Sequence, residues 1–405
     1  MKDGKGLTSN HRLMPLGIYI SVPFCRTKCT YCNFASDVFS KAVFSRYVDR
    51  VCEDLDRAMA MSGEMGGQFE RTVDSVYLGG GTPTVLTPSE LERLFAAIKR
   101  NFSVLPDAEI TVECAPGTLS ALMLETLQTC GVNRVSLGVQ SLVDQEAAAV
   151  GRLHKQGTVF DDVARLRLAG ISNINVDLIA GLPLQTAESW EVSLSGVMDL
   201  GTPHASVYML EVDEDSRLGR ELIAGGTKYH AHFVPDEDLT ADLYERACER
   251  LDAAGVKQYE ISNFAKAGYE SRHNLKYWTR RPYLGFGVDA HSMLKASGEG
   301  EAVRFSTPDS LEEYVAGGAL KRTPVSWQQA LEEAFFLGLR LTDGLSLDQL
   351  RSVFGALVIT GLNPTIADLA GLGLIDWQGD TVRLTPRGRL LSNEAFERFL
   401  SQQAK

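Results

Sequence analysis

Short segments rich in valine and isoleucine alternate with longer helical segments along the first half of the chain. This alternation predicts βα units and a parallel sheet, because parallel neighbours need a long crossover connection, which is usually a helix. The expected strands are residues 18–22, 73–78, 110–113, 134–139, 174–179 and 205–210. The expected helices are residues 44–61, 89–101, 120–130, 159–169 and 187–200. We therefore expect an α/β fold whose sheet is either open or curled into a partial barrel.

Polar and glycine-rich stretches follow four of these strands. PFCRTKCTYC follows the first strand, GGGTPT the second, ECAPGT the third and GVQS the fourth. The carboxyl ends of parallel strands meet at one edge of a sheet, and α/β proteins carry their ligands there. The sequence thus predicts a single functional mouth.

The charge balance restricts the class of partner. The 405 residues include 40 Lys and Arg against 52 Asp and Glu, a net charge of −12. This balance argues against a broad surface for nucleic acid or anionic membranes, so we expect no nucleic-acid partner. No apolar run approaches the roughly 18 residues that span a bilayer, and the N-terminal residues lack the apolar core of a secretory signal. We expect a cytoplasmic protein with no integral membrane segment.

Three of the seven cysteines, Cys25, Cys29 and Cys32, lie within eight residues. An odd number of cysteines in a chain without an export signal argues against a disulfide framework. A loop with this spacing can wrap three thiolates around one face of a cubic iron–sulfur cluster. A structural zinc site needs four ligands, and no fourth Cys or His lies near in sequence. Three ligands leave one iron open. We interpret the other cysteines as small buried apolar residues: Cys52, Cys114, Cys130 and Cys248.

The segment 19–34, YISVPFCRTKCTYCNF, resembles the radical S-adenosylmethionine (SAM) superfamily. More narrowly, the chain resembles the branch that contains oxygen-independent coproporphyrinogen III oxidase and the HemW haem chaperones, in order from about Leu16 to the C-terminus. The resemblance implies a partial (β/α)6 TIM-like barrel that holds a [4Fe-4S] cluster. The open iron of that cluster chelates the amino and carboxylate groups of SAM. One electron then splits SAM into methionine and a 5′-deoxyadenosyl radical, so an electron donor is an implied partner.

This resemblance also sets the expected organisation of the chain. We divide the chain into a flexible N-terminal tail (1–14), a core barrel (15–240), a barrel-side extension (241–300), a connector (301–328) and a C-terminal domain (329–405). The C-terminal domain is expected to be α+β with a winged-helix outline: a helix, a second helical region, a β-hairpin and a terminal helix. It carries 7 Lys and Arg against 9 Asp and Glu. This charge balance favours a domain that packs against the barrel or covers its opening over one that binds DNA.

The residues expected at SAM come from several strands. In Gly79–Gly81, glycines let the backbone approach a small polar ligand closely, and the resemblance implies that Gly80, Gly81 and Thr82 contact SAM. Glu113 can bind ribose hydroxyls or an ammonium group; its alternative role is a helix cap or an ion pair. The other implied SAM contacts are Tyr19, Tyr31, Gln140, Arg152, Asp177 and Met209. Gln140, Arg152 and Asp177 match positions that meet SAM or a second SAM-like ligand, and each is otherwise a structural ion pair.

Two departures from the oxidase pattern and one motif separate the chaperone from the oxidase. The oxidase pattern continues C-x3-C-x2-C-x-C, and Phe34 stands where the further cysteine is expected; only 24 residues precede Cys25, whereas the oxidase carries a longer N-terminal segment. HNLKYW (273–278) matches the HNxxYW signature of the chaperone branch. Imidazole can bind haem iron, and aromatic rings can pack on a porphyrin. The expected haem residues are His273, Asn274, Tyr277 and Trp278.

Three functions stay open. The first is a carrier that binds a cluster, SAM and haem as cargo and delivers haem to acceptor proteins. The second is the oxidase, which converts two propionates of coproporphyrinogen III to vinyl groups. The third is another radical SAM enzyme, such as a methyltransferase or cyclopropanase. The choice between His273 and His291 as the axial ligand is also open.

Overall fold

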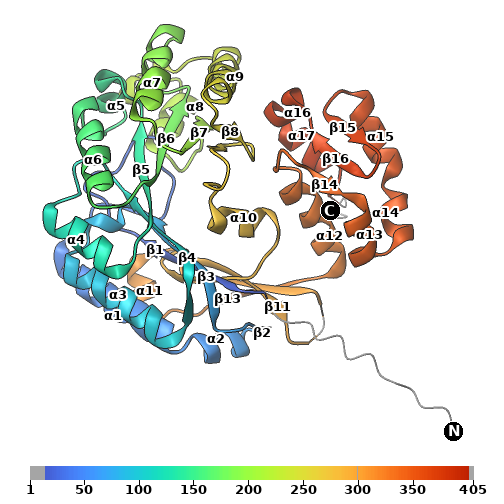
Figure 1. The fold of residues 1–405 in the computed structure, drawn as a ribbon, viewed down its shortest axis with the longest axis horizontal. Helices are drawn as coiled ribbons and strands as arrows, with labels where there is room; N and C mark the ends of the chain where they lie inside the picture. Colours follow the sequence, from blue (N-terminus) through green and yellow to red (C-terminus); the bar gives the residue numbers. More distant parts are fainter. Residues whose placement is uncertain (1–13, 299, 401–405) are drawn as a thin grey trace.

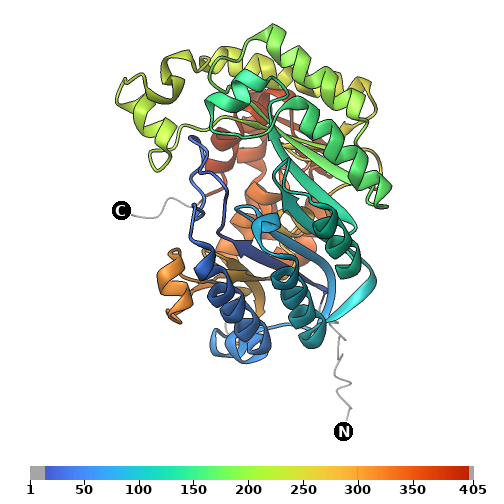
Figure 2. The same ribbon diagram turned by 90° about the vertical axis from the view of Figure 1, so that its left-hand side faces the viewer.

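The computed structural model describes residues 14–298 and 300–400, so the expected tail lies outside the described residues except for Met14. The six expected strands are β1 (Leu16–Val22), β3 (Thr72–Gly80), β4 (Ser103–Cys114), β5 (Arg134–Gln140), β6 (Asn173–Ala180) and β7 (His204–Met209). They pair in parallel and in chain order. Figures 1 and 2 show helices covering the outer face of the curved sheet. The predicted α/β partial barrel is confirmed.

Capping residues mark the ends of several outer helices. Thr87 and Glu90 form a reciprocal capping box at the start of α3 (Pro88–Asn101), which satisfies N–H groups that have no partner within the helix. Gly131 and Gly201 end α4 (Ala121–Cys130) and α7 (Ala187–Leu200) in the left-handed conformation, which costs glycine little. The remaining helices between barrel strands are α5 (Asp144–Ala149) and α6 (Gln156–Leu168). The expected helix 44–61 is interrupted at Arg57 and forms α1 (Phe44–Asp56) and α2 (Ala58–Glu64).

Further strands extend the barrel sheet at both ends. After α8 (Arg217–Ile223) and α9 (Glu237–Ala253), strand β9 (Asn263–Ala265) pairs with β7 in antiparallel orientation, and β8 (Lys257–Gln258) pairs with β9. At the other end, β10 (Tyr283–Gly287) pairs with β1 in parallel, on the side away from β3. β11 (His291–Ala296) continues from β10, and β2 (Gly67–Gln68) pairs with β11. The short helix α10 (Arg272–Trp278) precedes β10.

The structure differs from the connector expected over residues 301–328. β12 (Ala302–Ser306) and β13 (Lys321–Val325) are strands of the main sheet, with α11 (Leu311–Val315) between them. Val303 and Phe305 are buried, whereas β13 is the last strand of the sheet and carries Lys321 and Pro324. Charged residues and proline are tolerated on an edge strand because one of its sides makes no ladder hydrogen bonds. This arrangement explains the mixed polarity of the segment.

The C-terminal domain lies beside the barrel in Figure 1, with α10 between the two. It consists of α12 (Trp327–Gly338), β14 (Leu345–Ser346), α13 (Leu347–Phe354), α14 (Ala356–Gly361), α15 (Asn363–Gly371), β15 (Ile375–Gln378), β16 (Thr381–Leu384), α16 (Pro386–Leu390) and α17 (Ser392–Glu397). This order has the expected winged-helix outline, and the domain has a hydrophobic core of its own. Two short helices replace the single terminal helix expected. Within the described residues, no helix combines the length and apolarity needed to cross a membrane.

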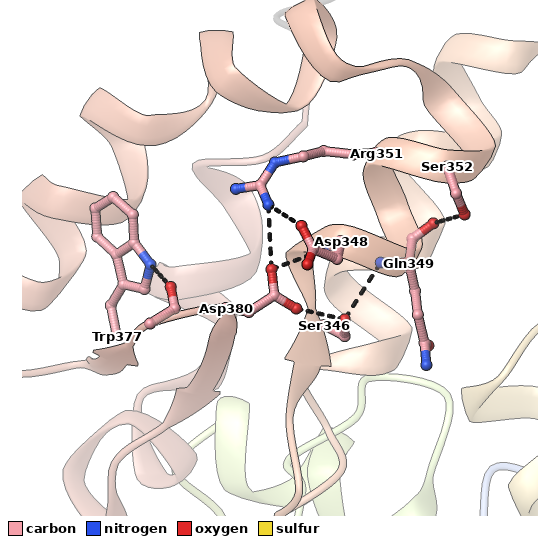
Figure 3. A network of polar contacts seen from close by, with 8 residues as sticks. Ser346, Asp348, Gln349, Arg351, Ser352, Trp377 and Asp380 are labelled. Carbon is pink, nitrogen blue, oxygen red and sulfur yellow. Dashed lines mark hydrogen bonds and ion pairs between the residues drawn. The ribbon is translucent and has the colours of Figure 1, made fainter.

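Asp380, in the turn between β15 and β16, fixes the start of α13 (Figure 3). Its carboxylate accepts hydrogen bonds from the Ser346 hydroxyl at 2.6 Å and from the Asp348 backbone N–H at 2.8 Å. Arg351 Nη1 lies 3.1 Å from the same carboxylate. A carboxylate at a helix N-terminus is favourable because the N–H groups there point outward. The hairpin therefore sets the position of a helix distant in sequence.

Candidate functional site

A cavity of about 430 Å³ lies at the carboxyl ends of the barrel strands and continues into the barrel. Most residues predicted to bind the cluster or SAM line this one cavity, together with one residue predicted at haem. They are Cys25, Cys29, Tyr31, Cys32, Gly80, Gly81, Thr82, Glu113, Gln140, Arg152, Asp177, Met209 and Asn274. The structure thus brings these residues together in one cavity. Which of them bind the cluster, SAM or haem stays a prediction.

The loop after β1, which carries the three cysteines, is tied back on itself. The Cys25 backbone N–H donates to Asp37 O at 3.0 Å. Lys28 Nζ donates to the carbonyl oxygens of Phe34 at 2.7 Å and Ser36 at 2.5 Å. Burial raises the pKa of the Cys25 thiol. A thiol must lose its proton to bind metal, so metal binding would have to supply the free energy of this deprotonation. The loop therefore presents its cysteines on a backbone that is already held in place.

Polar groups approach two of these sulfurs. Arg152 Nη1 lies 3.6 Å from Cys29 Sγ, and Thr82 Oγ1 lies 4.0 Å from Cys25 Sγ. The Thr82 hydroxyl lowers the pKa of Cys25 and so partly offsets the effect of burial on the thiolate, which is the form that binds iron. No three Cys, His, Asp or Glu side chains among residues 14–298 and 300–400 converge as ligands of one metal ion. Three thiols of one loop line one cavity, with polar groups beside two of the sulfurs, and this donor set fits a cubic cluster whose irons each take a separate thiolate.

Each glycine of Gly79–Gly81, at the end of β3, is required for a different steric reason. A Cβ on Gly79 would lie 2.8 Å from Glu113 Oε1, and a Cβ on Gly81 would lie 2.6 Å from Phe24 O and 2.8 Å from Val22 O. Gly80 adopts a φ of +96°, a conformation that residues with a Cβ rarely adopt. The Gly81 N–H donates to Val22 O at 2.7 Å. The GGG segment therefore packs directly against the start of the cysteine loop.

Glu113, the penultimate residue of β4, lines the cavity. The Tyr77 hydroxyl donates to Glu113 Oε1 at 2.7 Å. Burial raises the pKa of Glu113 from 4.5 to about 7, with the charge of Asp177 acting in the same direction. A carboxyl group with such a pKa can donate or accept a hydrogen bond at neutral pH.

Replacing Glu113 by Gln should remove a pH dependence from the free energy of unfolding. A carboxyl group with a raised folded-state pKa stabilises the fold fully below its unfolded pKa, near 4.5, and loses this contribution as pH rises through about 7. We expect wild type to lose roughly 2 to 3 kcal/mol relative to Glu113→Gln between pH 5 and 8, at about 1.4 kcal/mol per pKa unit. Urea unfolding of the cluster-free chains across this range measures the difference. Glu92→Gln, on the exposed face of α3, is the control; equal pH dependence in wild type and Glu113→Gln would contradict the prediction.

The barrel interior also holds polar residues of which the sequence analysis predicted only Gln140 and Asp177. Arg134, Ser136, Gly138 and Gln140 occupy every second position of β5 and line the cavity. The corresponding residues of β6 and β7 are Asn175, Asp177, Ser206 and Tyr208. Successive side chains of a strand point to opposite faces, so polar residues at alternate positions of an otherwise apolar strand mark a polar interior. This alternation was the signal that could have identified them.

Asn175 connects these interior residues. Its Nδ2 donates to Asp177 Oδ1 and to Ser136 Oγ, both at 2.7 Å, and its Oδ1 lies 2.6 Å from His204 Nδ1. Burial raises the pKa of Asp177. Arg134 is buried nearby, and its Nε has no hydrogen-bond partner in the part of the chain that the structure describes. The floor of the cavity is therefore polar and fixed by side-chain hydrogen bonds.

A second cavity, of about 290 Å³, adjoins the first. The two share Phe34, Ser36 and Gly80 as lining residues. The remaining lining residues of the second cavity are Tyr19, Ser21, Ala35, Tyr277, Tyr283, Asp289 and His291. Tyr19, predicted at SAM, lies here rather than in the cavity with the cysteines. Four of the ten residues that line the second cavity are Tyr or Phe, so we call it the aromatic cavity.

The structure divides the four predicted haem residues among different surroundings. Asn274 lines the first cavity and Tyr277 the second. The Trp278 ring stacks under the Arg340 guanidinium, 4.2 Å from ring centroid to Cζ, and so packs toward the C-terminal domain. Residues on successive positions of a short helix point in different directions. The motif consequently does not form one surface.

His273 is 1% exposed and lines neither cavity. Its Nδ1 lies 3.0 Å from Ser75 Oγ, and its Nε2 lies 3.0 Å from the Tyr277 hydroxyl. Burial lowers the pKa of His273 to about 3, so the ring is neutral. Both ring nitrogens already have partners. The structure therefore does not support the expectation that His273 is open to haem iron, because one of these bonds would have to break first.

Comparisons with known proteins agree with this architecture. Residues 19–195 match the radical SAM superfamily, and residues 325–391 match the HemN C-terminal domain. The solved structure of coproporphyrinogen III oxidase (HemN) from Escherichia coli superposes with a TM-score of 0.81 at 24% identity, covering 96% of this chain and 90% of that one. At this identity, the similarity shows the fold alone.

Curated relatives extend the match along nearly the whole chain. "Heme chaperone HemW" of Bacillus subtilis is 36% identical over 95% of this chain and 99% of its own length. The protein of the same description from Escherichia coli is 30% identical over 96% of this chain and all of its own length. Radical SAM membership implies a [4Fe-4S] cluster and SAM, which fit the donor set described above. From the cysteine loop through the C-terminal domain, this chain belongs to the HemW haem chaperone family within the radical SAM superfamily.

Proposed function

We propose that this protein is a haem carrier that binds a [4Fe-4S] cluster, SAM and haem, and passes haem to acceptor proteins. The observation that carries the proposal is the contact between the two cavities through Phe34, Ser36 and Gly80. One cavity offers thiols and polar groups, and the other offers aromatic faces that suit a flat apolar ligand. Relatives described as heme chaperones over their full length support the same function.

In this proposal, Cys25, Cys29 and Cys32 would hold the cluster. Once bound, the cluster and SAM supply the one-electron chemistry of the family, with the electron coming from a donor protein. Thr82 and Glu113 would hold polar groups of SAM, and the backbone of Gly80 and Gly81 allows close approach. Further proposed contacts are Tyr31, Gln140, Arg152, Asp177 and Met209. Haem would occupy the aromatic cavity beside Tyr277.

Coproporphyrinogen III oxidation is the second candidate, because the cavity retains the residues expected to hold SAM. Phe34 argues against it. This side chain is 66% exposed and lies at the boundary of the two cavities, where the oxidase pattern has a further cysteine. A phenyl ring cannot donate or accept a proton, whereas a thiol can.

The wild-type chain should bind haem and fail to turn over coproporphyrinogen III. Anaerobically reconstituted protein is first titrated with haem, and a Soret band that saturates is expected. The same preparation is then incubated with SAM, a reductant and coproporphyrinogen III, and no repeated formation of protoporphyrinogen is expected. Multiple turnovers would establish the oxidase instead. A chain with an intact cluster that binds no haem would leave a radical SAM enzyme of another kind.

A further inference from the structure

We infer that His291, rather than the buried His273, supplies the nitrogen that binds haem iron in the aromatic cavity. This inference rests on the proposed function and names the ligand within it. His291 lines the cavity, and its side chain is 65% exposed. An exposed imidazole can reach iron without prior rearrangement, and neutral imidazole is a common axial ligand of haem.

The walls of the same cavity suit a porphyrin. Tyr277 and Tyr283 meet edge to face, with ring centroids 4.7 Å apart and planes 89° apart. Tyr19 and Phe34 also line the cavity, and Phe34 is exposed to solvent. Aromatic rings bury large apolar areas and pack on flat conjugated ligands. His291 therefore stands at the rim of an aromatic site and not on a bare surface.

The Asp289 carboxylate lies beside the His291 ring, just beyond hydrogen-bond distance. Its Oδ1 lies 3.6 Å from His291 Nε2. Within the described residues, His291 Nδ1 has no hydrogen-bond partner, so one ring nitrogen faces a carboxylate and the other is free. Histidines that bind metal commonly have a carboxylate at the second nitrogen, which fixes the ring and makes the ligand more basic.

The turn that carries Asp289 is held in place by hydrogen bonds. Asp289 adopts a φ of +52°, a left-handed conformation that aspartate tolerates better than most residues with a side chain. Thr307 Oγ1 accepts from the Ala290 N–H at 2.8 Å and donates to Gly287 O at 2.5 Å. The Asp289 N–H donates to Pro308 O at 2.8 Å. The chain therefore maintains a backbone conformation that points Asp289 and His291 to the same rim.

The other described histidines near the barrel are less suited to this role. His273 and His204 are buried, and each uses both ring nitrogens in hydrogen bonds. His154 lines the cavity with the cysteines, and burial lowers its pKa to about 4. His154 has a free Nε2, but it lies away from the aromatic walls. It is the strongest competitor and belongs in the test.

Haem titrations of the reconstituted full chain test the assignment. His291→Ala should weaken haem affinity by at least roughly 10–100-fold, the loss typical of groups that tune a metal ligand, and should move the Soret maximum. Asp289→Asn should give a smaller loss. Added imidazole should return the Soret maximum of His291→Ala toward that of wild type, which a purely structural role would not produce. His230→Ala, an exposed histidine outside both cavities, should behave as wild type.

The competing variants separate the possible failures. Unchanged affinity and Soret position in His291→Ala, with loss in His154→Ala or in a folded His273→Ala, would overturn the assignment and leave haem binding intact. Circular dichroism and thermal melting establish whether the His273 variant folds. Wild-type protein that binds no haem would overturn the proposed function, and this assignment with it.

Discussion

Cys25→Ala, Cys29→Ala and Cys32→Ala should each abolish the iron–sulfur absorbance of the anaerobically reconstituted protein. All three cysteines lie on one loop and line one cavity; Cys114 also lines this cavity, from the end of β4, whereas Cys52, Cys130 and Cys248 lie outside it. Wild type should take up about four irons per chain, as expected for a [4Fe-4S] cluster with one open iron. Two thiolates cannot replace three, so each variant should retain little or no iron.

Cys52→Ala is the matched control. Cys52 lies on α1, and its sulfur only approaches Arg93 O at 3.8 Å, so this variant should bind iron like wild type. Iron analysis and absorption spectra of the four variants decide the matter. Stoichiometric zinc in protein purified without oxygen, with no uptake of iron, would contradict the assignment of a cluster.

Gly81→Ala should damage the site through sterics alone. The added Cβ would lie 2.6 Å from Phe24 O and 2.8 Å from Val22 O. Both are backbone atoms at the start of the cysteine loop, so neither can rotate away. The loop must shift from the end of β3. Overpacking of this kind costs about 1–3 kcal/mol of stability, and the displaced loop should also lose SAM binding.

Gly157→Ala provides the contrast, because its Cβ would meet nothing within 4 Å. Gly157 lies in α6, where alanine is the better helix former, so this variant should be slightly stabilised. Urea unfolding measures the stabilities, and SAM-induced changes in the spectrum of the reduced cluster measure binding. Wild-type SAM affinity in Gly81→Ala would show that SAM binding does not require the close packing of Gly79–Gly81 against the cysteine loop.

The barrel could be predicted because its strands and helices carry local signals. The six strands of the barrel carry recurrent valine, isoleucine and leucine residues, and Thr87, Gly131 and Gly201 mark helix ends by capping chemistry that acts within a few residues. β12 and β13 could not be predicted in the same way. β13 is the edge strand and carries charged residues and a proline, which an open edge tolerates, so it lacks an apolar strand pattern. β12 lies between β11 and β13, and its five residues are too few to show a clear period.

The site was predictable to the extent that its residues follow strand ends. The cysteine loop and Gly79–Gly81 meet at one mouth for this reason. The depth of His273 could not be read from its motif, because burial depends on Ser75 and Glu109, which come from other strands. Arg134 and Asn175 were missed although their alternation was visible. A polar interior became evident only when the strands were closed into a barrel.

The pairing of β10 with β1 has a consequence for how the protein is made. β1 precedes the cysteine loop, and Gly17 lies opposite Tyr283 at one end of this pair. During synthesis, one edge of β1 therefore lacks its neighbour until the chain has been extended through β10. Pairings between distant segments form slowly, and an open strand edge invites aggregation. The cysteine loop is thus synthesised early, but the strand pairing beside it forms only after β10 has been made. We therefore expect cluster insertion to follow completion of the polypeptide rather than to begin on the ribosome.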